Sequence, residues 1–510
     1  MKKEPKRGFP LPTHIIVSGL LLLIQFVLLA AVVYDYTLAS TAAYFLTTVL
    51  GMLTVIIIIN RRGNPDHKIS WIVFILVFPV FGITVFLLWG GGSVLPNIRK
   101  RMKTAKERYS KHLSENEDVL NTLKYKDMLH FRQAQYLTRE SGYPAYDGTV
   151  TEYFSPIEDM MPRLLEELSQ AEKYIFIEFF ILAEGRMWDS VHKILKEKAK
   201  AGVEVKIIFD DFGSIKRQSK GFVSRLKSEG IEVAVFNPIN PVMNIFMNNR
   251  NHRKIIVIDG KTAFTGGFNI GDEYCNYVER FGYWKDSAVI IKGRAVKSFL
   301  SMFCSMWEFT TRKPIKMENY ICDFSVGSDG FVIPYSDDPI DDKNPAQGIY
   351  MQILSTAQRY VYIATPYLII DNAMKDCLMM AAKSGIDVKI AVPHIPDKWY
   401  VDYVTKYNYL ELLEAGVKIY EYTPGFIHSK MFVSDDSVAT VGTVNMDYRS
   451  FDFHFECGVW IANSQTVKDI KEDFLSIFDR SEEIKIETWK KRPVSQRLKQ
   501  ALLHIFAPFM

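Results

Sequence analysis

The chain has 510 residues and carries 62 Lys and Arg against 58 Asp and Glu, so its net charge is only +4 at neutral pH. This near balance argues against a dedicated nucleic-acid-binding protein, which would carry a basic excess over a whole domain. The length is sufficient for a membrane segment and two lobes of ordinary domain size. The cysteines are dispersed without CxxC spacing, which favours a reducing compartment over a disulfide framework: Cys275, Cys304, Cys322, Cys377 and Cys457.

The N-terminal part contains three apolar stretches, residues 14–34, 42–59 and 71–89, each near the length that crosses a hydrocarbon core. We therefore expect residues 1–95 to form a transmembrane region of three spans. The polar residues 60–69 indicate that the last two spans form a hairpin. A cleaved signal peptide is the alternative for the first stretch, because basic residues precede it, but its apolar core is long for that role and two further stretches follow.

Residues 96–140 follow as a basic juxtamembrane segment, with Lys and Arg concentrated just after the third apolar stretch. Such a cluster favours contact with anionic lipid headgroups, and a solvated helical face is the alternative. The cluster and the dispersed thiols favour a cytoplasmic side for the lobes that follow. Basic residues at the N-terminus and at positions 61, 62 and 68 oppose this orientation, so the charge rule is nearly balanced.

The remainder of the chain repeats one pattern. A strand-like apolar run at residues 174–180 precedes a helix that stops at a glycine and leads into a second β-branched run, and residues 360–367 begin the same series. Glycine at a helix end before a β-branched run is typical of α/β proteins. We therefore expect an α/β fold of two similar lobes, residues 141–320 and 321–488, that together form one pseudo-symmetric active site.

Each half contains the same signature of His, Lys and Asp at fixed spacing. The first copy is His252, Lys254 and Asp259, and the second is His428, Lys430 and Asp435. A glycine and an asparagine follow each copy at equal distances: Gly266 and Asn269, then Gly442 and Asn445. Self-similarity at fixed offsets implies a duplicated structural unit, so the two histidines are predicted to share one site.

A pair of histidines can exchange phosphodiesters, because one attacks phosphorus as a nucleophile and the other protonates the leaving oxygen. Fixed donors must then stabilise the negative charge on the non-bridging oxygens. Lys254, Lys430, Asn269 and Asn445 are the predicted phosphate-binding residues.

Each histidine also needs an acceptor that fixes its tautomer. Asp286 and Glu456, downstream of the two signatures, are the residues predicted to accept these hydrogen bonds from the histidines. Asp259 and Asp435 belong to the catalytic signature, but each ends an apolar run before a turn, so we interpret them as holding local structure. His454 is interpreted as a packing or strand-face residue.

These signatures resemble the phospholipase D superfamily and, more narrowly, its bacterial cardiolipin synthases. The resemblance rests on residues 251–260 with 265–274, on 425–430 with 442–445, and on the N-terminal hydrophobic hairpin with its Asn-Pro turn. It covers nearly the whole chain. The first apolar stretch departs from the family's pattern, which begins with the hairpin alone.

The resemblance implies a multi-pass enzyme of the bacterial cell membrane that transfers a phosphatidyl group between two phosphatidylglycerol molecules. The products would be cardiolipin and glycerol, formed through a phosphohistidine on His252 with His428 as the acid, although the symmetry of the site leaves the choice of nucleophile open. No nucleotide, metal or other cofactor is expected, because one phosphodiester is exchanged for another. Phosphatidylglycerol and anionic membrane lipids would be its partners, and nucleic acid would not.

Two alternatives use the same residues. In a membrane-tethered hydrolase, water would replace the acceptor lipid, and in a different phosphatidyltransferase another alcohol would do so. A non-catalytic scaffold is disfavoured because neither signature is eroded. The C-terminal segment, residues 489–510, combines basic residues with a Leu, Ile and Phe stripe, which predicts an interfacial amphipathic helix or a helix packed on the second lobe.

Overall fold

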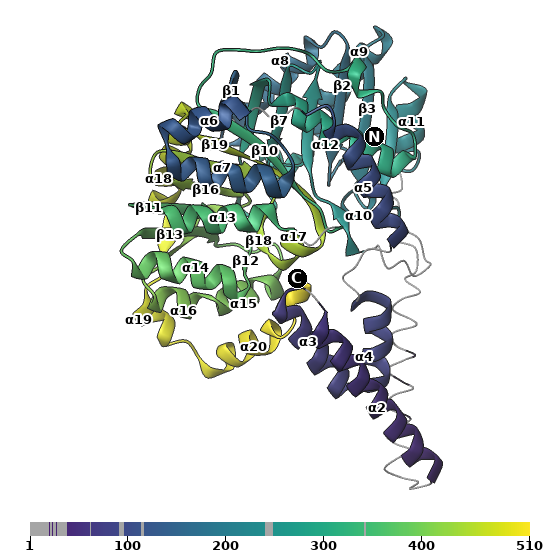
Figure 1. The fold of residues 1–510 in the computed structure, drawn as a ribbon, viewed down its shortest axis with the longest axis vertical. Coiled ribbons are helices and arrows are strands. Elements are labelled where there is room, and N and C mark those ends of the chain that lie inside the picture. Colours follow the sequence, from purple (N-terminus) through teal and green to yellow (C-terminus); the bar gives the residue numbers. More distant parts are fainter. Residues whose placement is uncertain are drawn as a thin grey trace.

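The computed structural model describes residues 38–61, 63–90, 96–113, 117–239, 248–340 and 343–510, together with Leu20, Leu23 and Val27. Two lobes lie side by side, and the N-terminal helices project away from them (Figure 1). The first lobe is built on a sheet of seven strands and the second on a sheet of nine.

The first sheet has the strand order β1-β9-β7-β6-β2-β3-β4. Strands β2, β3 and β4 run parallel to one another. The neighbouring pairs β2-β6, β6-β7, β7-β9 and β9-β1 are all antiparallel. The bounds are β1 Thr149–Phe154, β2 Tyr174–Phe179, β3 Glu204–Asp210, β4 Glu232–Phe236, β6 Lys254–Ile258, β7 Thr262–Gly266 and β9 Ala288–Gly293.

The second sheet repeats this order as β10-β19-β17-β16-β11-β13-β14, with β20 added beyond β14, and its ninth strand, β5 (Arg250–Asn251), pairs with β19. Its parallel and antiparallel pairs match those of the first sheet strand for strand. This repeat confirms the predicted α/β class. The bounds are β10 Phe331–Asp337, β11 Tyr360–Ala364, β13 Asp387–Pro393, β14 Lys418–Tyr422, β16 Met431–Ser434, β17 Val438–Gly442, β19 His454–Ala462 and β20 Ser481–Glu483.

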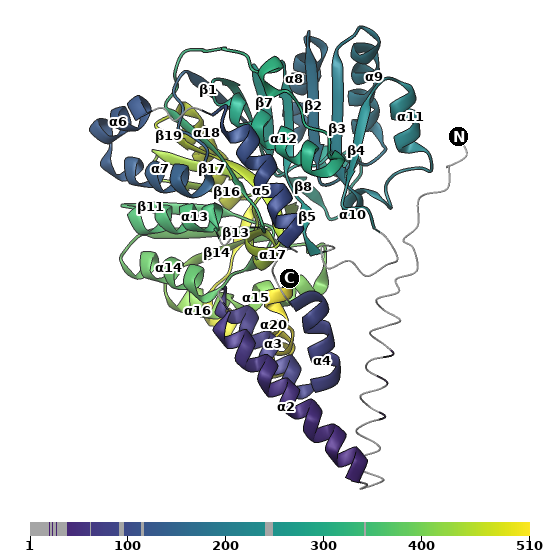
Figure 2. The same ribbon diagram turned by 45° about the vertical axis from the view of Figure 1, so that its right-hand side comes forward.

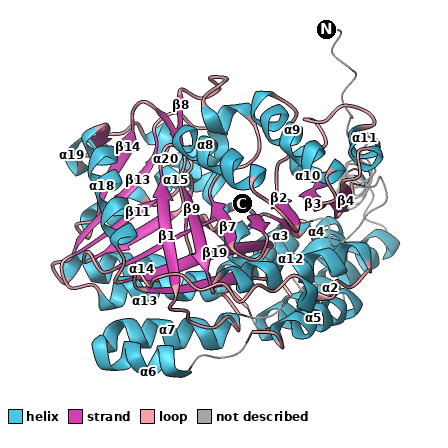
Figure 3. Ribbon diagram, turned by 90° about the horizontal axis from the view of Figure 1, so that it is seen from above, coloured by secondary structure: helices cyan, strands magenta, loops and turns pink. Residues whose placement is uncertain are grey.

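Helices cover both faces of each sheet (Figure 3). Amphipathic helices with one apolar side pack on the outer faces. In the first lobe these are α8 Ile157–Ser169, α9 Arg186–Lys200 and α11 Phe222–Ser228, and in the second α13 Pro345–Thr356, α14 Asn372–Lys383 and α16 Tyr409–Glu414. Helices α12, Val296–Thr311, and α18, Gln465–Asp479, occupy equivalent places on the inner faces.

One apolar core joins the two inner faces. It combines Phe176, Val257 and Val289 of the first lobe with Val433 and Val459 of the second. Across the same junction Arg253 donates to Asp338 Oδ1 at 2.7 Å, and both side chains are buried. The lobes therefore form one body, and residues near the ends of their strands are held at a fixed separation.

Short strand pairs also cross between the lobes. β5, Arg250–Asn251, runs parallel to the start of β19, and β15, Gly425–Ile427, runs parallel to β8, Tyr283–Lys285. Within the second lobe β12, Leu368–Ile369, pairs with β18, Met446–Asp447. Each signature histidine directly follows one of the crossing strands, so these pairs carry both signatures to the junction.

The basic segment after the N-terminal region forms α5 Pro96–Ser110, α6 Glu117–Lys126 and α7 Met128–Ser141. Met102, Ala105 and Tyr109 of α5 are buried against the core, and α5 packs along α12. Arg101 lies over the Phe309 ring at 4.3 Å. At least this part of the cluster therefore stabilises contacts with the first lobe.

The N-terminal region forms α2 Leu38–Asn60, α3 Pro65–Val77, α4 Pro79–Val85 and the short π-helix η1 Phe86–Gly90. Figure 2 shows α2 extending away from the lobes beside α3 and α4. The third predicted span, residues 71–89, is not one helix, because Pro79 interrupts it and α4 folds back so closely that a Cβ on Gly82 would lie 2.8 Å from Ile75 Cα.

Over the described residues, no helix reaches the combined length and hydropathy that crossing a bilayer requires. The predicted transmembrane spans are therefore not supported there. The first of them, residues 14–34, lies almost wholly outside the described residues.

The C-terminal segment forms α19 Ile486–Lys490, α20 Val494–His504 and η5 Ala507–Phe509. Helix α20 packs on α15, Trp399–Tyr407. Its other side leaves Val494, Leu498 and Leu502 exposed. Contact with the second lobe and an exposed apolar face thus occur together on one helix.

Candidate active site

The two signatures lie at matching positions of the two lobes. His252 and Lys254 stand at the start of β6, and His428 and Lys430 stand just before β16. The apolar, β-branched residues that follow make each strand a buried central strand of its sheet. The polar residues are thereby placed at the strand ends, at the junction of the lobes.

Each histidine is held by a carboxylate from the opposite lobe. His252 Nδ1 lies 2.8 and 2.9 Å from the two carboxylate oxygens of Glu456, and His428 Nδ1 lies 2.7 Å from Asp286 Oδ2. All four side chains are buried. A carboxylate on Nδ1 fixes that nitrogen as the N–H donor and leaves Nε2 as the basic nitrogen. Glu456 and Asp286 therefore lie beside the histidines, in a crossed arrangement that their sequence positions do not reveal.

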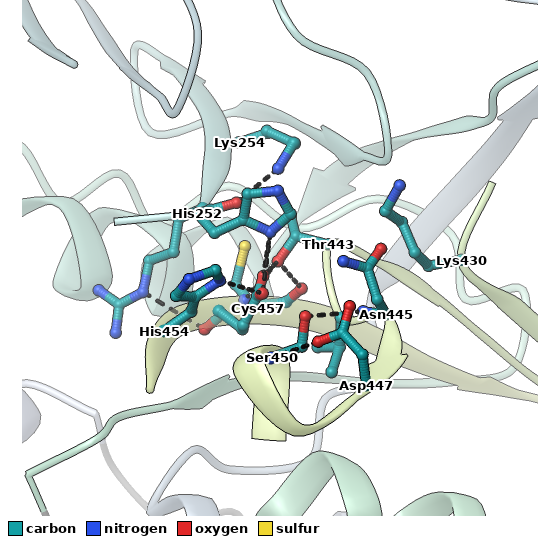
Figure 4. A network of polar contacts seen from close by, with 12 residues as sticks. His252, Lys254, Lys430, Thr443, Asn445, Asp447, Ser450, His454 and Cys457 are labelled. Carbon is teal, nitrogen blue, oxygen red and sulfur yellow. Dashed lines mark hydrogen bonds and ion pairs between the residues drawn. The ribbon is translucent and has the colours of Figure 1, made fainter. Parts of the chain in front are cut away.

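The signature lysines interact electrostatically with both histidines. Figure 4 shows Lys254 beside His252 and Lys430 beside Asn445. Lys254 Nζ donates to the backbone oxygen of His252 at 2.6 Å, and Lys430 Nζ donates to that of His428. Burial lowers the pKa of Lys254 to about 8 and that of Lys430 to about 7. The two ammonium groups thus form an anion site whose charge is lost in mildly alkaline solution.

The histidines share this electrostatic environment. Burial lowers the pKa of His252 well below its ordinary value, and Lys254, Lys430 and His428 lower it further. Burial and Lys430 lower the pKa of His428 to about 4, against the opposing effect of Asp286. Both rings are therefore neutral near pH 7 in the absence of a bound anion.

The two asparagines are not equivalent. Asn269 Oδ1 accepts from Ile181 N at 3.0 Å, and its amide donates to Tyr274 Oη at 2.8 Å. Asn445 lies beside Lys430 (Figure 4), and its buried Oδ1 has no hydrogen-bond partner. A buried amide without a partner is costly unless a ligand supplies one. Asn445 is consequently the better placed of the two for contact with a substrate.

The signature aspartates lie at the other end of their strands. Asp259 accepts from the backbone amides of Glu172, Lys173 and Tyr174 at 2.7, 2.8 and 2.8 Å. Asp435 makes the same three contacts to residues 358–360, at 2.8 to 3.1 Å. They hold the start of the neighbouring strand, roughly five residues or 16 Å along the strand from the lysines, which agrees with their structural interpretation.

Close backbone approach explains the glycines after each signature. A Cβ on Gly442 would lie 2.5 Å from Cys457 O, and one on Gly266 would overlap Ser287 O. The second lobe has Thr443 where the first has Gly267. Thr443 Oγ1 donates to Glu456, whereas Asp286 accepts from the backbone amide of Ser287 at 2.9 Å.

A further asymmetry was missed by the sequence analysis. The residue two positions before each carboxylate packs on the histidine of the other lobe: Trp284 lies 5.2 Å from the His428 ring, and His454 lies 5.5 Å from the His252 ring. Trp284 Nε1 donates to Asp286 at 3.4 Å, whereas His454 Nδ1 is 3.7 Å from Glu456 and has no hydrogen-bond partner. His454, interpreted from sequence as a packing residue, thus borders the candidate site.

His252, His454 and Glu456 also place three possible metal-ligand atoms within 4.8 Å of one another. A dication there would have to replace the hydrogen bond between His252 and Glu456. It would also lie near the ammonium groups of Lys254 and Lys430, which oppose it. This cluster therefore fits an imidazole held by a carboxylate better than a metal centre.

Two equivalent lobes that join their histidines, lysines and carboxylates in one buried site define a phospholipase D-like transferase. A family profile described as "Cardiolipin synthase, PLD-like domain" matches residues 164–307 and 350–478, and one described as "Phospholipase_D-nuclease N-terminal" matches residues 49–91. The chain is 33% identical to a cardiolipin synthase of Geobacillus over 93% of its own length and 98% of that protein. It therefore belongs to the family of phospholipase D-like cardiolipin synthases and is a phosphatidyltransferase.

Two other comparisons show further similarity to known proteins. An uncharacterized protein of Streptococcus mutans is 40% identical over 90% of this chain and 99% of its own length. Among solved structures, the phosphatidylserine synthase of Haemophilus influenzae covers 74% of this chain and 98% of its own, with a TM-score of 0.56 and 15% identity. At that identity the likeness shows a common fold.

Proposed function

We propose that this protein makes cardiolipin by transferring a phosphatidyl group from one phosphatidylglycerol to a second, with release of glycerol. The observation that carries the proposal is the crossed pair of histidine–carboxylate contacts, 2.8 Å for His252 with Glu456 and 2.7 Å for His428 with Asp286. Each contact leaves one Nε2 for chemistry at phosphorus. The names of several relatives support the choice of product.

In the first step His252 Nε2 forms a bond to phosphorus while the bond from phosphorus to the glycerol oxygen breaks. His428 gives a proton to that oxygen, and glycerol leaves. In the second step His428 takes the proton from a headgroup hydroxyl of the second lipid. The hydroxyl oxygen bonds to phosphorus, the bond to His252 Nε2 breaks, and cardiolipin is released.

The charges of the site suit this division of roles. A neutral imidazole is required for attack, and burial with two nearby lysines keeps His252 neutral. His428 must carry a proton, and the anionic phosphate of a bound lipid raises the pKa of a neighbouring imidazole. Asp286 already favours the protonated form of His428. Lys254, Lys430 and Asn445 would bind the non-bridging oxygens, where charge accumulates in the transition state.

Attachment to the bilayer is part of the proposal, with the lobes on the cytoplasmic side. Helix α2 carries a broad set of exposed apolar side chains, which is unusual for a surface that faces only water. They include Phe45, Leu46, Leu50, Met52, Leu53, Ile56, Ile57 and Ile59. The exposed face of α20 would lie at the same interface.

The test supplies the purified protein with radiolabelled phosphatidylglycerol in phosphatidylcholine vesicles and separates the products. Cardiolipin with an equal amount of glycerol is the expected result. Phosphatidic acid as the main product would identify a hydrolase, and no turnover would identify a scaffold. Acid-free quenching and peptide mass spectrometry should find the phosphatidyl adduct on His252, and an adduct on His428 would reverse the assigned roles.

Alanine at His252 or at His428 should each abolish turnover, because the two residues form one site. The variants need a matched surface control, for which exposed Lys383 on α14 is suitable. Substantial cardiolipin synthesis by either histidine variant would contradict the mechanism.

A further inference from the structure

A cavity in the described part of the chain lies apart from the histidine pair, between the N-terminal helices and the second lobe. Its volume is about 1170 Å³. Its walls come from the end of α2, from α3 and η1, from the residues around α17, Tyr448–Asp452, and from the C-terminus. Pockets for drug-sized molecules have about 300–1,000 Å³, so this cavity has room for a larger ligand.

Aromatic rings dominate its apolar surface. They come from segments far apart in the sequence: Trp71, Phe74, Phe86, Phe453, Phe506 and Phe509. Trp71 lies 5.3 Å from the Phe86 ring and 5.1 Å from the Phe509 ring, so the walls pack on one another through these residues. A surface of this kind suits acyl chains.

Charged side chains of both signs border the cavity. Three carboxylates border it, and all are engaged within the protein: Asp452 pairs with His67 at 2.9 Å, Asp338 with Lys106 at 2.6 Å, and Asp371 accepts from Asn64 at 3.1 Å. Lys68 also borders the cavity and donates to the backbone oxygen of Ile59 at 3.3 Å. Arg61 lies over the Phe86 ring at 5.2 Å. Both cations therefore line the cavity next to its aromatic wall.

The inner end of the cavity lies next to β19, the strand that carries Glu456, the carboxylate bonded to the proposed nucleophile His252. Asp66 accepts from Tyr448 Oη at 2.7 Å, and the His67 ring lies 5.2 Å from Phe453, so α3 docks on the segment that leads into β19. The next residue is His454, and β19 also carries Glu456. Asn249 Nδ2 donates to Phe453 O at 3.0 Å, which ties this segment to the strand before His252.

We propose that this cavity binds an anionic diacyl phospholipid, with its acyl chains against the aromatic wall and its phosphate toward Lys68 and Arg61. The inference rests on the proposed function and extends it: the N-terminal helices form a lipid chamber beside the active site. The ligand chemistry is shared by phosphatidylglycerol and cardiolipin, which are substrate and product of the proposed reaction. Their relative binding decides whether the chamber serves supply or product retention.

The test uses the full-length His252→Ala protein, so that no turnover changes the lipid. The protein is reconstituted with phosphatidylglycerol that carries a photoreactive group on one acyl chain, and crosslinked peptides are mapped after irradiation. Crosslinks should fall on the peptides that contain Trp71 and Phe453. Competition by unlabelled phosphatidylglycerol, cardiolipin or phosphatidylcholine separates the possible ligands, and phosphatidylcholine should compete weakly.

Two substitutions in this background sharpen the result. Lys68→Glu should lower crosslinking at Trp71 and Phe453 by roughly tenfold, because it replaces an attraction with a repulsion, and Lys383→Glu on the far helix α14 should not. Trp71→Ala should lower crosslinking at Phe453, whereas Phe45→Ala on the exposed side of α2 should leave it intact. Circular dichroism melting shows whether each variant is folded.

Crosslinks confined to exposed residues of α2, or equal competition by phosphatidylcholine, would contradict the proposal that this cavity binds an anionic phospholipid. Either result would leave the proposed transferase reaction untouched, because that reaction is tested by products of the unmodified protein. Conversely, a chamber that binds phosphatidylglycerol in a protein that makes no cardiolipin would overturn the reaction alone.

Discussion

His252 and His428 have the same bond to a carboxylate but different neighbours. The His428 ring contacts Trp284, whose indole N–H is a permanent donor, and the His252 ring contacts His454, whose pKa burial lowers to about 4. Lys254 and Lys430 differ less, since burial lowers the pKa of both. These differences at single residues lead to two predictions.

The first concerns the pH dependence of kcat/KM. Only a protonated lysine attracts the phosphate, so the fall of kcat/KM with pH, which begins with loss of the His428 proton, should steepen as pH rises through about 7 to 8, the range of the lowered lysine pKa values. Lys430→Met should reduce activity by roughly 10²–10³-fold and leave an alkaline limb set by Lys254 alone, at higher pH. A pH series on both proteins with constant vesicle composition measures this. A limb that does not move in the variant would contradict the role of Lys430.

The second concerns His454. His454→Trp gives His252 the neighbour that His428 already has, so the adduct on His252 should still form at a rate within about tenfold of the unmodified protein. His454→Ala removes the ring and should slow adduct formation by about 10–100-fold, the usual loss when a supporting contact is removed. Rapid quenching with labelled lipid measures both rates. Equal rates for the alanine variant and the unmodified protein would show that the ring does not position His252.

At the scale of secondary structure, the signature aspartates hold neighbouring strands together by accepting hydrogen bonds from backbone amides. Asp259 is buried and bonds three successive amides at the start of β2, whereas Asp435 bonds the same three positions before β11 at a more exposed site. The hydrogen bonds of each aspartate fix one strand against the strand that begins at the signature.

Asp259→Ala should therefore lower the free energy of unfolding by about 2–3 kcal/mol, because buried amides lose a charged acceptor. Asp435→Ala should cost less, because its amides can reach water. Denaturant unfolding measures both, and the specific activity of the folded fraction should stay within a few-fold. Full stability combined with complete loss of activity in Asp259→Ala would place this residue in the catalytic machinery.

Sequence patterns predicted much of this level of structure. The repeated runs at 174–180 and 360–367 became β2 and β11, and the α/β class followed from glycine-terminated helices before β-branched runs. The third apolar stretch is not supported as one continuous helix, because Pro79 divides it between α3 and α4.

At the scale of the whole molecule, the exchanged carboxylates make each half incomplete without the other. Glu456 serves His252 and Asp286 serves His428, through β19 and β8, which pair with β5 and β15 of the opposite lobe. Neither lobe alone contains a histidine with its carboxylate.

This arrangement predicts different defects for Glu456→Gln and Asp286→Asn. With a lipid substrate both should lose roughly 10²–10⁴-fold. With an activated p-nitrophenyl phosphodiester, whose leaving group needs no proton, Asp286→Asn should recover its burst of nitrophenol and Glu456→Gln should not. Stopped-flow absorbance measures the burst. Recovery in Glu456→Gln instead would exchange the roles of the two histidines.

The sequence by itself determined the duplication, the α/β class, the signature residues and the family resemblance, because these depend on residue types at fixed spacing along the chain. Tertiary structure alone decided which carboxylate holds which histidine, that Asn269 is engaged by Ile181 and Tyr274 while Asn445 Oδ1 is not, and that Trp284 and His454 flank the rings. Those contacts join residues up to about two hundred positions apart. They depend on how two sheets pack across a shared core, which spacing within either half does not encode.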